Sequence, residues 1–132
     1  MNSVDVLKLT PNHLRALTGD RTGAELAAVL PARWLVLGGE ALSWELAERL
    51  NGAGRCRVLN HYGPTEATVG ASSYRVGRRD AAPLAATVPI GQPLANLQLH
   101  VLDARQQLLP RISTQRMFAT QQWINSLSVE RQ

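Results

Sequence analysis

Four consecutive apolar residues at positions 34–37 run directly into the pair Gly38-Gly39, and this combination constrains the fold more than any other feature of the chain. A strand without polar alternation is typical of a parallel sheet whose two faces are both covered. Paired glycines at its carboxyl end let a ligand or another backbone approach closely, and ligands of open α/β sheets bind at that end. We therefore expect an α/β fold with a ligand loop after residue 37.

A second apolar strand, at residues 56–59, leads into the stretch 60–68, which reads Asn-His-Tyr-Gly-Pro-Thr-Glu-Ala-Thr. Gly63 and Pro64 predict a turn after this strand, because glycine accepts unusual backbone angles and proline cannot extend a strand ladder. We therefore expect two ligand loops at one edge of the predicted sheet.

The side chains around this turn suit a nucleotide. Thr65 offers a hydroxyl and Glu66 a carboxylate. Together with nearby backbone N–H groups, they can bind a phosphate oxygen and Mg²⁺, which takes oxygen ligands. Tyr62 can lay its ring against a planar base. Ordinary solvated turns contain the same residue types, so the stretch alone leaves both interpretations open.

The rest of the chain continues the alternation of helices and strands. We expect strands at residues 4–9, 69–76 and 96–102, helices over 11–18, 23–30 and 44–50, and a weak helix at 120–127. Thr10 and Ser43 are the predicted N-caps, and His13 and His100 are predicted surface histidines. The buried positions predicted on the first two helices are Leu14, Leu17, Leu26, Val29 and Leu30.

The net charge of +4 and the isoelectric point near 10.2 raise the question of a nucleic-acid binder. The fourteen basic residues are scattered among ten acidic residues, and all of them except Lys8 are arginines. Aromatic residues make up 5% of the chain, which is too few for a base-stacking surface. We therefore expect no nucleic-acid partner.

Cys56 is the only cysteine, which excludes an intrachain disulfide framework and a thiolate metal site. The sequence begins without a basic segment followed by an apolar run, and it contains no stretch of about 18 apolar residues. The expected location is the cytoplasm, with no membrane partner. At 132 residues, the chain is expected to form at most one domain.

Several stretches of the sequence together resemble the adenylation domains of nonribosomal peptide synthetases, which belong to the adenylate-forming, AMP-binding ligases. They follow the family's order and spacing, and the most specific signal is Asn-x-Tyr-Gly-Pro-Thr-Glu with Gly-Gly-Glu upstream. The stretches are residues 7–11, 35–42, 60–68, 89–96 and 101–103. The resemblance covers residues 4–110.

The resemblance implies a parent enzyme that uses ATP and Mg²⁺ to convert an amino acid into an aminoacyl-AMP and then loads it onto a carrier-protein thiol. It implies that Tyr62 stacks on the adenine, that Thr65 meets the α-phosphate and that Glu66 holds Mg²⁺. The nucleotide-binding residues that it implies are Gly39, Glu40, Asn60, Tyr62, Gly63 and Thr65.

The resemblance also implies a pocket for the amino-acid side chain, made of Lys8, Val36, Gly38, His61, Val69 and Gly70. This combination resembles that of aspartate-activating domains. Lys8 and His61 supply hydrogen-bond donors, which a buried carboxylate needs, while the glycines leave room and the valines form apolar walls. The alternative is that Lys8 reaches solvent from a strand end and that His61 is an incidental loop residue.

Parts of the family's pattern are missing: the phosphate loop, two aspartates for substrate and ribose, and the C-terminal domain with its catalytic lysine. No catalytic set is therefore complete. We expect residues 1–110 to be a partial AMP-binding domain, taken from the large N-terminal subdomain with its mostly parallel sheet and flanking helices, and to end at the start of a β-rich subdomain. Residues 111–132 are expected to be a divergent, weakly structured tail, frameshifted or junctional.

Three classes of function follow from the sequence. The first is a truncated amino-acid adenylation domain that is inactive by itself. The second is a small non-enzymatic α/β module that binds a nucleotide or a partner protein. A basic nucleic-acid binder comes last, because the charge is not clustered.

Overall fold

The computed structural model describes residues 4–63, 70–77, 86–102, 105, 107 and 127–131. Within them, a mixed five-stranded sheet has the strand order β1-β2-β3-β4-β5. The strands are β1 (Val6–Leu9), β2 (Trp34–Gly38), β3 (Arg57–Tyr62), β4 (Ser72–Arg75) and β5 (Gln92–Pro93). β1, β2 and β3 are parallel, whereas β4 and β5 are added in antiparallel orientation. The predicted α/β class is confirmed.

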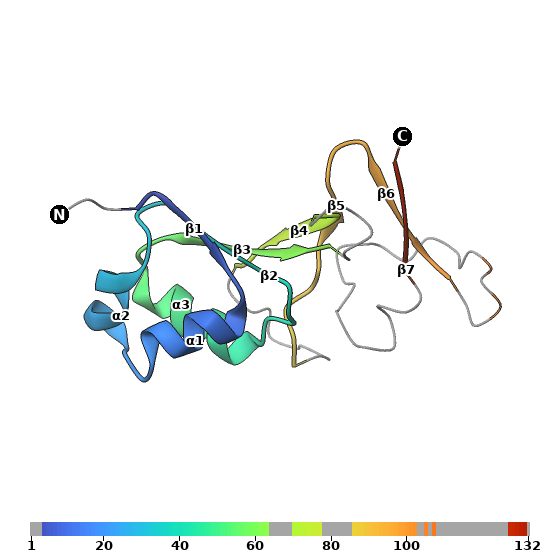
Figure 1. Ribbon diagram of the computed structural model, residues 1–132. Helices are drawn as coiled ribbons and strands as arrows, with labels where there is room; N and C mark the ends of the chain where they lie inside the picture. The colour runs from blue at the N-terminus through green and yellow to red at the C-terminus, as the bar shows by residue number, and fades with distance from the viewer. Residues whose placement is uncertain are drawn as a thin grey trace.

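The described helices are α1 (Pro11–Thr18), α2 (Gly23–Val29) and α3 (Trp44–Ala53), and they lie on the same side of the sheet (Figure 1). Along β2, Leu35 and Leu37 are buried, whereas Trp34 and Val36 are only half-buried. The prediction that both faces of this strand are covered is therefore wrong for the described part of the chain. The core between helices and sheet contains Leu14, Leu26, Leu30, Leu35, Leu37, Leu42, Trp44, Leu46, Ala47, Leu50, Val58, Val76 and Val88.

Both predicted N-caps are confirmed. Thr10 Oγ1 accepts the backbone N–H of His13 at 3.3 Å, and Ser43 Oγ accepts that of Leu46 at 3.3 Å. These bonds satisfy donors that the first turn of a helix leaves unpaired. α3 is three residues longer than predicted, because it ends only at Gly54, which takes the left-handed conformation that closes a helix.

Two helical residues that were predicted to face the core lie outward. Leu17 is 63% exposed and Val29 is 47% exposed. The next residue is buried in both places: Thr18 in α1, where it takes the place of Leu17, and Leu30 directly after α2, as predicted. In α1, Thr18 follows the buried Leu14 by four positions and lies about 40° from it around the helix axis. Leu17 follows Leu14 by three positions and lies about 60° away on the other side, which turns it farther from the core.

Thr18 is buried because its hydroxyl is hydrogen-bonded in both directions. It donates to the backbone oxygen of Leu14 at 2.8 Å and accepts from Arg49 Nη2 at 2.7 Å. The same guanidinium nitrogen donates to the backbone oxygen of Gly19 at 2.7 Å. Arg49 thus joins α3 to the end of α1.

A second, two-stranded sheet pairs β6 (Leu97–Val101) with β7 (Leu127–Arg131) in antiparallel orientation. β6 confirms the strand predicted at 96–102. The helix predicted at 120–127 falls mostly outside the described residues, and Leu127 belongs to a strand instead. The predicted division of the chain after residue 110 stays a prediction. Among the described helices, none has the length and apolar character needed to cross a membrane.

Candidate functional site

The two predicted ligand loops begin side by side, at the carboxyl ends of β2 and β3. Gly38 and His61 are Cα partners in the ladder that joins these strands. A Cβ added at Gly38 would come 2.5 Å from the backbone oxygen of His61, so the close approach needs glycine at this position. The expected meeting of both loops at one sheet edge is therefore confirmed.

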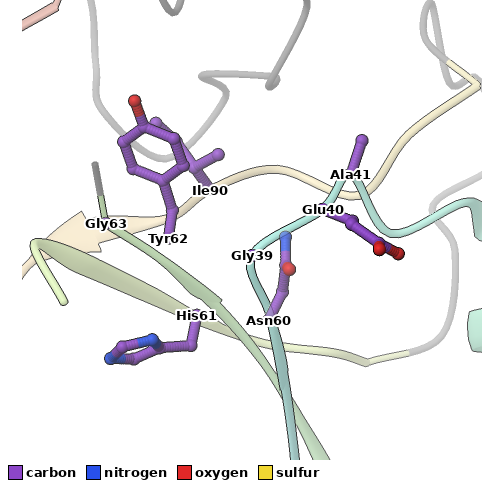
Figure 2. Close-up of a pocket in the computed structure, with 8 residues that line it drawn as sticks. All are labelled: Gly39, Glu40, Ala41, Asn60, His61, Tyr62, Gly63 and Ile90. Atoms are coloured by element: carbon purple, nitrogen blue, oxygen red, sulfur yellow. The ribbon is translucent and has the colours of Figure 1, made fainter. Parts of the chain in front are cut away.

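A cavity of about 90 Å³ lies between these loops, and we call it the Tyr62 cavity (Figure 2). It is lined by Gly39, Glu40, Ala41, Asn60, His61, Tyr62, Gly63 and Ile90. Five of the six predicted nucleotide-binding residues are in this lining. Thr65 and the predicted metal ligand Glu66 lie outside the described residues. Ala41 and Ile90 were missed, although both belong to stretches that carry the family resemblance.

Asn60 is buried, and its side chain is fixed by the backbone on the other side of the cavity. Its Nδ2 donates to the backbone oxygen of Pro89 at 2.8 Å and to that of Val88 at 3.4 Å. These bonds use the donors of the amide, and no hydrogen bond to Asn60 Oδ1 is found in the described ranges. The arrangement therefore offers an acceptor to a ligand.

Glu40 has a structural partner at the start of α1. Its Oε2 accepts the backbone N–H of Asn12 at 3.0 Å. A carboxylate at this place satisfies an unpaired donor and interacts favourably with the positive end of the helix dipole. Glu40 thus fixes α1 relative to the loop that follows β2. In Figure 2, the Glu40 carboxylate extends away from the Tyr62 ring.

A second and larger cavity, of about 520 Å³, adjoins the same loops, and we call it the Lys8 cavity. It is lined by Lys8, Leu9, Thr10, His13, Gly38, Gly39, His61 and Gly63. It shares Gly39, His61 and Gly63 with the Tyr62 cavity. Three of the six predicted side-chain-pocket residues are therefore brought together here: Lys8, Gly38 and His61.

The strand register explains why these residues meet. Lys8 pairs with Val36, and Gly38 pairs with His61. Because successive residues of a strand alternate between faces, all four positions belong to the sheet face that the described helices leave open. Val36 is half-buried there but does not line the cavity. Val69 lies outside the described residues.

Gly70 packs against the side chain of His61, which lines the Lys8 cavity. A Cβ added at Gly70 would overlap Nε2 and Cε1 of the His61 imidazole. Only a residue without a side chain leaves the ring its observed position. Gly70 is therefore in direct contact with His61, although it does not line the Lys8 cavity itself.

The pKa of His61 is lowered from its usual value of 6.5, mainly because partial burial disfavours the charged imidazolium. The positive charge of Lys8 lowers the pKa further. Without a bound anion, His61 is therefore neutral at neutral pH. The influence of Lys8 also indicates that the two basic groups are close.

This lowered pKa predicts that acid destabilises the fold through His61. Below pH 6.5 the unfolded chain binds a proton on this histidine more readily than the folded chain does. The stabilisation is thus complete above that pH and is lost as the pH falls toward the folded pKa. We expect the urea midpoint of the wild type to fall more steeply than that of His61→Gln between roughly pH 7 and pH 5. Parallel profiles for His61→Gln and wild type would contradict the prediction.

His13 was predicted to be a surface histidine, and the prediction did not include its position at the Lys8 cavity. Its side chain is exposed, but it lines the Lys8 cavity. The signal in the sequence was the helix start at Thr10-Pro11, which places residue 13 in the first turn after β1. Such a residue lies near the carboxyl ends of the parallel strands.

Metal ligands are not clustered in the part of the chain that the structure describes, where no group of three His, Cys, Asp or Glu side chains could hold an ion. The predicted Mg²⁺ ligand Glu66 is not among these residues. Its role stays a prediction.

The comparison with protein families accounts for this arrangement. Residues 1–114 match the family of AMP-binding enzymes, and the chain belongs to this family. It is 46% identical over 104 residues to AMB antimetabolite synthetase AmbE of Pseudomonas aeruginosa, covering 76% of this chain and 4% of that protein. It is 37% identical over 109 residues to bacitracin synthase 3 of Bacillus licheniformis, covering 80% of this chain and 2% of that protein. The chain thus spans 2% to 4% of the length of these relatives.

Solved structures give the same result. A four-domain nonribosomal peptide synthetase, holo-AB3403 bound to AMP and glycine, is similar over 83% of this chain and 7% of its own, with 39% identity and a TM-score of 0.60. NpsA-ThdA, an artificially fused adenylation–PCP di-domain from Klebsiella oxytoca, is similar over 82% of this chain and 19% of its own, with 25% identity and a TM-score of 0.63. The chain corresponds to part of the adenylation domain of a nonribosomal peptide synthetase.

Proposed function

We propose that the enzyme to which this chain belongs activates aspartate with ATP, forms aspartyl-AMP and transfers the aspartyl group to a carrier-protein thiol. In this proposal the chain supplies the base site and most of the side-chain pocket. The supporting observation is that the Tyr62 cavity and the Lys8 cavity adjoin and share Gly39, His61 and Gly63. One ligand in which an amino acid is joined to a nucleotide can therefore occupy both.

The Tyr62 cavity has groups that suit adenine. Tyr62 is half-buried at the end of β3, where its ring can stack on a base. Asn60 Oδ1 is the acceptor that an exocyclic amino group needs, because Asn60 Nδ2 is engaged by Val88 and Pro89. We propose that Thr65, which follows the described end of the loop at Gly63, binds the α-phosphate. Glu66 would hold Mg²⁺, which neutralises phosphate charge when bound.

The Lys8 cavity has the chemistry of a carboxylate pocket. Lys8 brings a positive charge, and His61 brings a ring N–H that can donate to a carboxylate oxygen. Gly38 and Gly70 leave space around the imidazole. An aspartate side chain would satisfy these donors, whereas asparagine would leave the lysine without a counter-charge.

Two features of the relatives support the remaining partners in the proposal. The structure of holo-AB3403 contains AMP and glycine, and NpsA-ThdA joins an adenylation domain to a PCP. By analogy, we propose a carrier-protein domain as the partner of the complete enzyme. We also propose that β6 marks the start of a β-rich subdomain.

A chimaera tests the substrate. Residues 4–102 of this chain would replace the corresponding segment of the four-domain synthetase that is 39% identical, whose adenylation domain supplies the missing parts. In ATP–pyrophosphate exchange across all amino acids, we expect aspartate to be preferred. Lys8→Met should lower kcat/KM for aspartate about tenfold, the lower end for a charged hydrogen bond, because Lys8 is exposed in the described structure.

Arg55→Met is the matched control, since it removes an exposed cation at the opposite edge of the sheet. It should leave kcat/KM unchanged. If the chimaera prefers asparagine or an apolar amino acid to aspartate, the assignment is wrong. If Lys8→Met and Arg55→Met are equally active with aspartate, the pocket does not work as proposed.

A further inference from the structure

We propose that His13 is a third basic contact in the Lys8 cavity and that Lys8, His13 and His61 together bind the side-chain acid group of a dicarboxylic amino acid. This inference rests on the proposed function and adds a specificity-determining residue to it. The three side chains come from β1, from the first turn of α1 and from the end of β3.

Among the residues that the structure describes, the ionisable side chains that line the Lys8 cavity are all basic: Lys8, His13 and His61. Glu40, from the neighbouring loop, lines the Tyr62 cavity instead, and its carboxylate accepts the Asn12 N–H. The charge of Lys8 disfavours a second positive charge on His61. An anionic ligand removes this repulsion and gains charge-assisted hydrogen bonds, so the cavity favours an acid over a neutral ligand.

The backbone fixes His13 in its position. Its own N–H is bound to Thr10 Oγ1 at 3.3 Å, and the preceding N–H, of Asn12, is bound to Glu40 at 3.0 Å. Pro11, as the first helical residue, holds the backbone angle that the turn needs. The exposed imidazole is therefore presented to the cavity from a rigid helix start, which reduces the loss of backbone freedom on binding.

The types of donor favour a carboxylate over an amide. Lys8 offers N–H donors only, and the His61 imidazole also becomes a donor at both nitrogens when a bound anion favours its charged form. A carboxylate accepts hydrogen bonds at both of its oxygens, whereas an amide accepts at one oxygen and turns its own N–H groups toward donors at the other side. A third basic group therefore strengthens discrimination between aspartate and asparagine, which have nearly the same shape.

Succinate titration of the 132-residue chain in the cold tests the inference directly. The probe carries the dicarboxylate without the amino group, and the imidazole NMR signals of the three histidines report binding. We expect the His13 and His61 signals to shift and the His100 signal to stay. His13→Gln should weaken succinate binding about fivefold, and His13→Arg, which keeps a basic group with N–H donors, should stay within about twofold of the wild type.

Two controls make the result specific. His100→Gln, on β6, should bind succinate as the wild type does, and uncharged succinamide should not compete. If His13→Gln binds succinate as tightly as the wild type while His61→Gln binds it more weakly, the role of His13 is wrong and the acid pocket stands. If the wild type binds no succinate, both the inference and the proposed acid pocket are wrong.

Discussion

Gly91→Ala is expected to lose about 3 kcal/mol or more of the free energy of unfolding, since it combines backbone strain with overlap in a packed core. Gly91 is buried and has φ of +82°, a conformation that residues with a side chain rarely adopt. A Cβ at this position would overlap the backbone carbonyl of Ser73 and lie 2.7 Å from the Cβ of Tyr74. Both neighbours belong to β4, so neither can move without breaking the sheet.

The strand pairing around Gly91 prevents the chain from relaxing. Gln92, the next residue, pairs with Ser73, and Ser72 Oγ donates to the backbone oxygen of Ile90 at 2.8 Å. Any shift that made room for a methyl group would break these bonds. It would also displace Ile90, which lines the Tyr62 cavity.

Urea denaturation checks this prediction, with Gly52→Ala as the matched control. Gly52 lies in α3, and a Cβ there would meet no atom within 4 Å. Alanine favours a helix over glycine by about 0.5–1 kcal/mol, so the control should be slightly stabilised. An unchanged urea midpoint for Gly91→Ala would show that the 91–93 segment is not fixed against β4 as described.

The sequence alone was sufficient to predict those features of the fold that depend on residues close together in the chain. The helix starts at Thr10 and Ser43 were predictable because a cap needs only a hydroxyl within hydrogen-bonding reach of the third residue of the helix. The meeting of the two loops was predictable because parallel strands bring their carboxyl ends to one edge. Five nucleotide-binding candidates line one cavity for this reason.

The sequence alone was not sufficient to predict those features that depend on contacts between residues far apart in the chain. Leu17 and Val29 have the apolar character of core residues, but only the face of each helix that packs on the sheet is buried, and both residues lie outside it. Thr18 is buried in place of Leu17 because Arg49, which is 31 positions away, bonds its hydroxyl. The exposed helix face of His13 predicts a surface histidine. Only the fold shows that His13 lines the same cavity as the ends of β1 and β3.

The chain by itself is expected to show at least about a thousandfold less aspartate-dependent ATP–pyrophosphate exchange than the chimaera, because it lacks several kcal/mol of electrostatic stabilisation. In this reaction a carboxylate attacks the α-phosphate, and both groups are anions. A cation must therefore stand beside the reacting atoms. Lys8 is the only lysine of the chain, and it faces the proposed side-chain pocket instead.

The arginines of the described residues do not replace this cation, because none of them lines the Tyr62 cavity or the Lys8 cavity. Arg15 donates to Ser43 Oγ at 2.9 Å, and Arg49 is bound to Thr18 and Gly19. We would measure exchange for the purified chain and the chimaera at equal concentration, together with AMP binding by the chain. AMP binding without exchange is the expected result, since the chain contains the proposed base site and its described arginines line neither cavity. Exchange by the chain at a rate near that of the chimaera would show that one of its own basic groups moves to the α-phosphate.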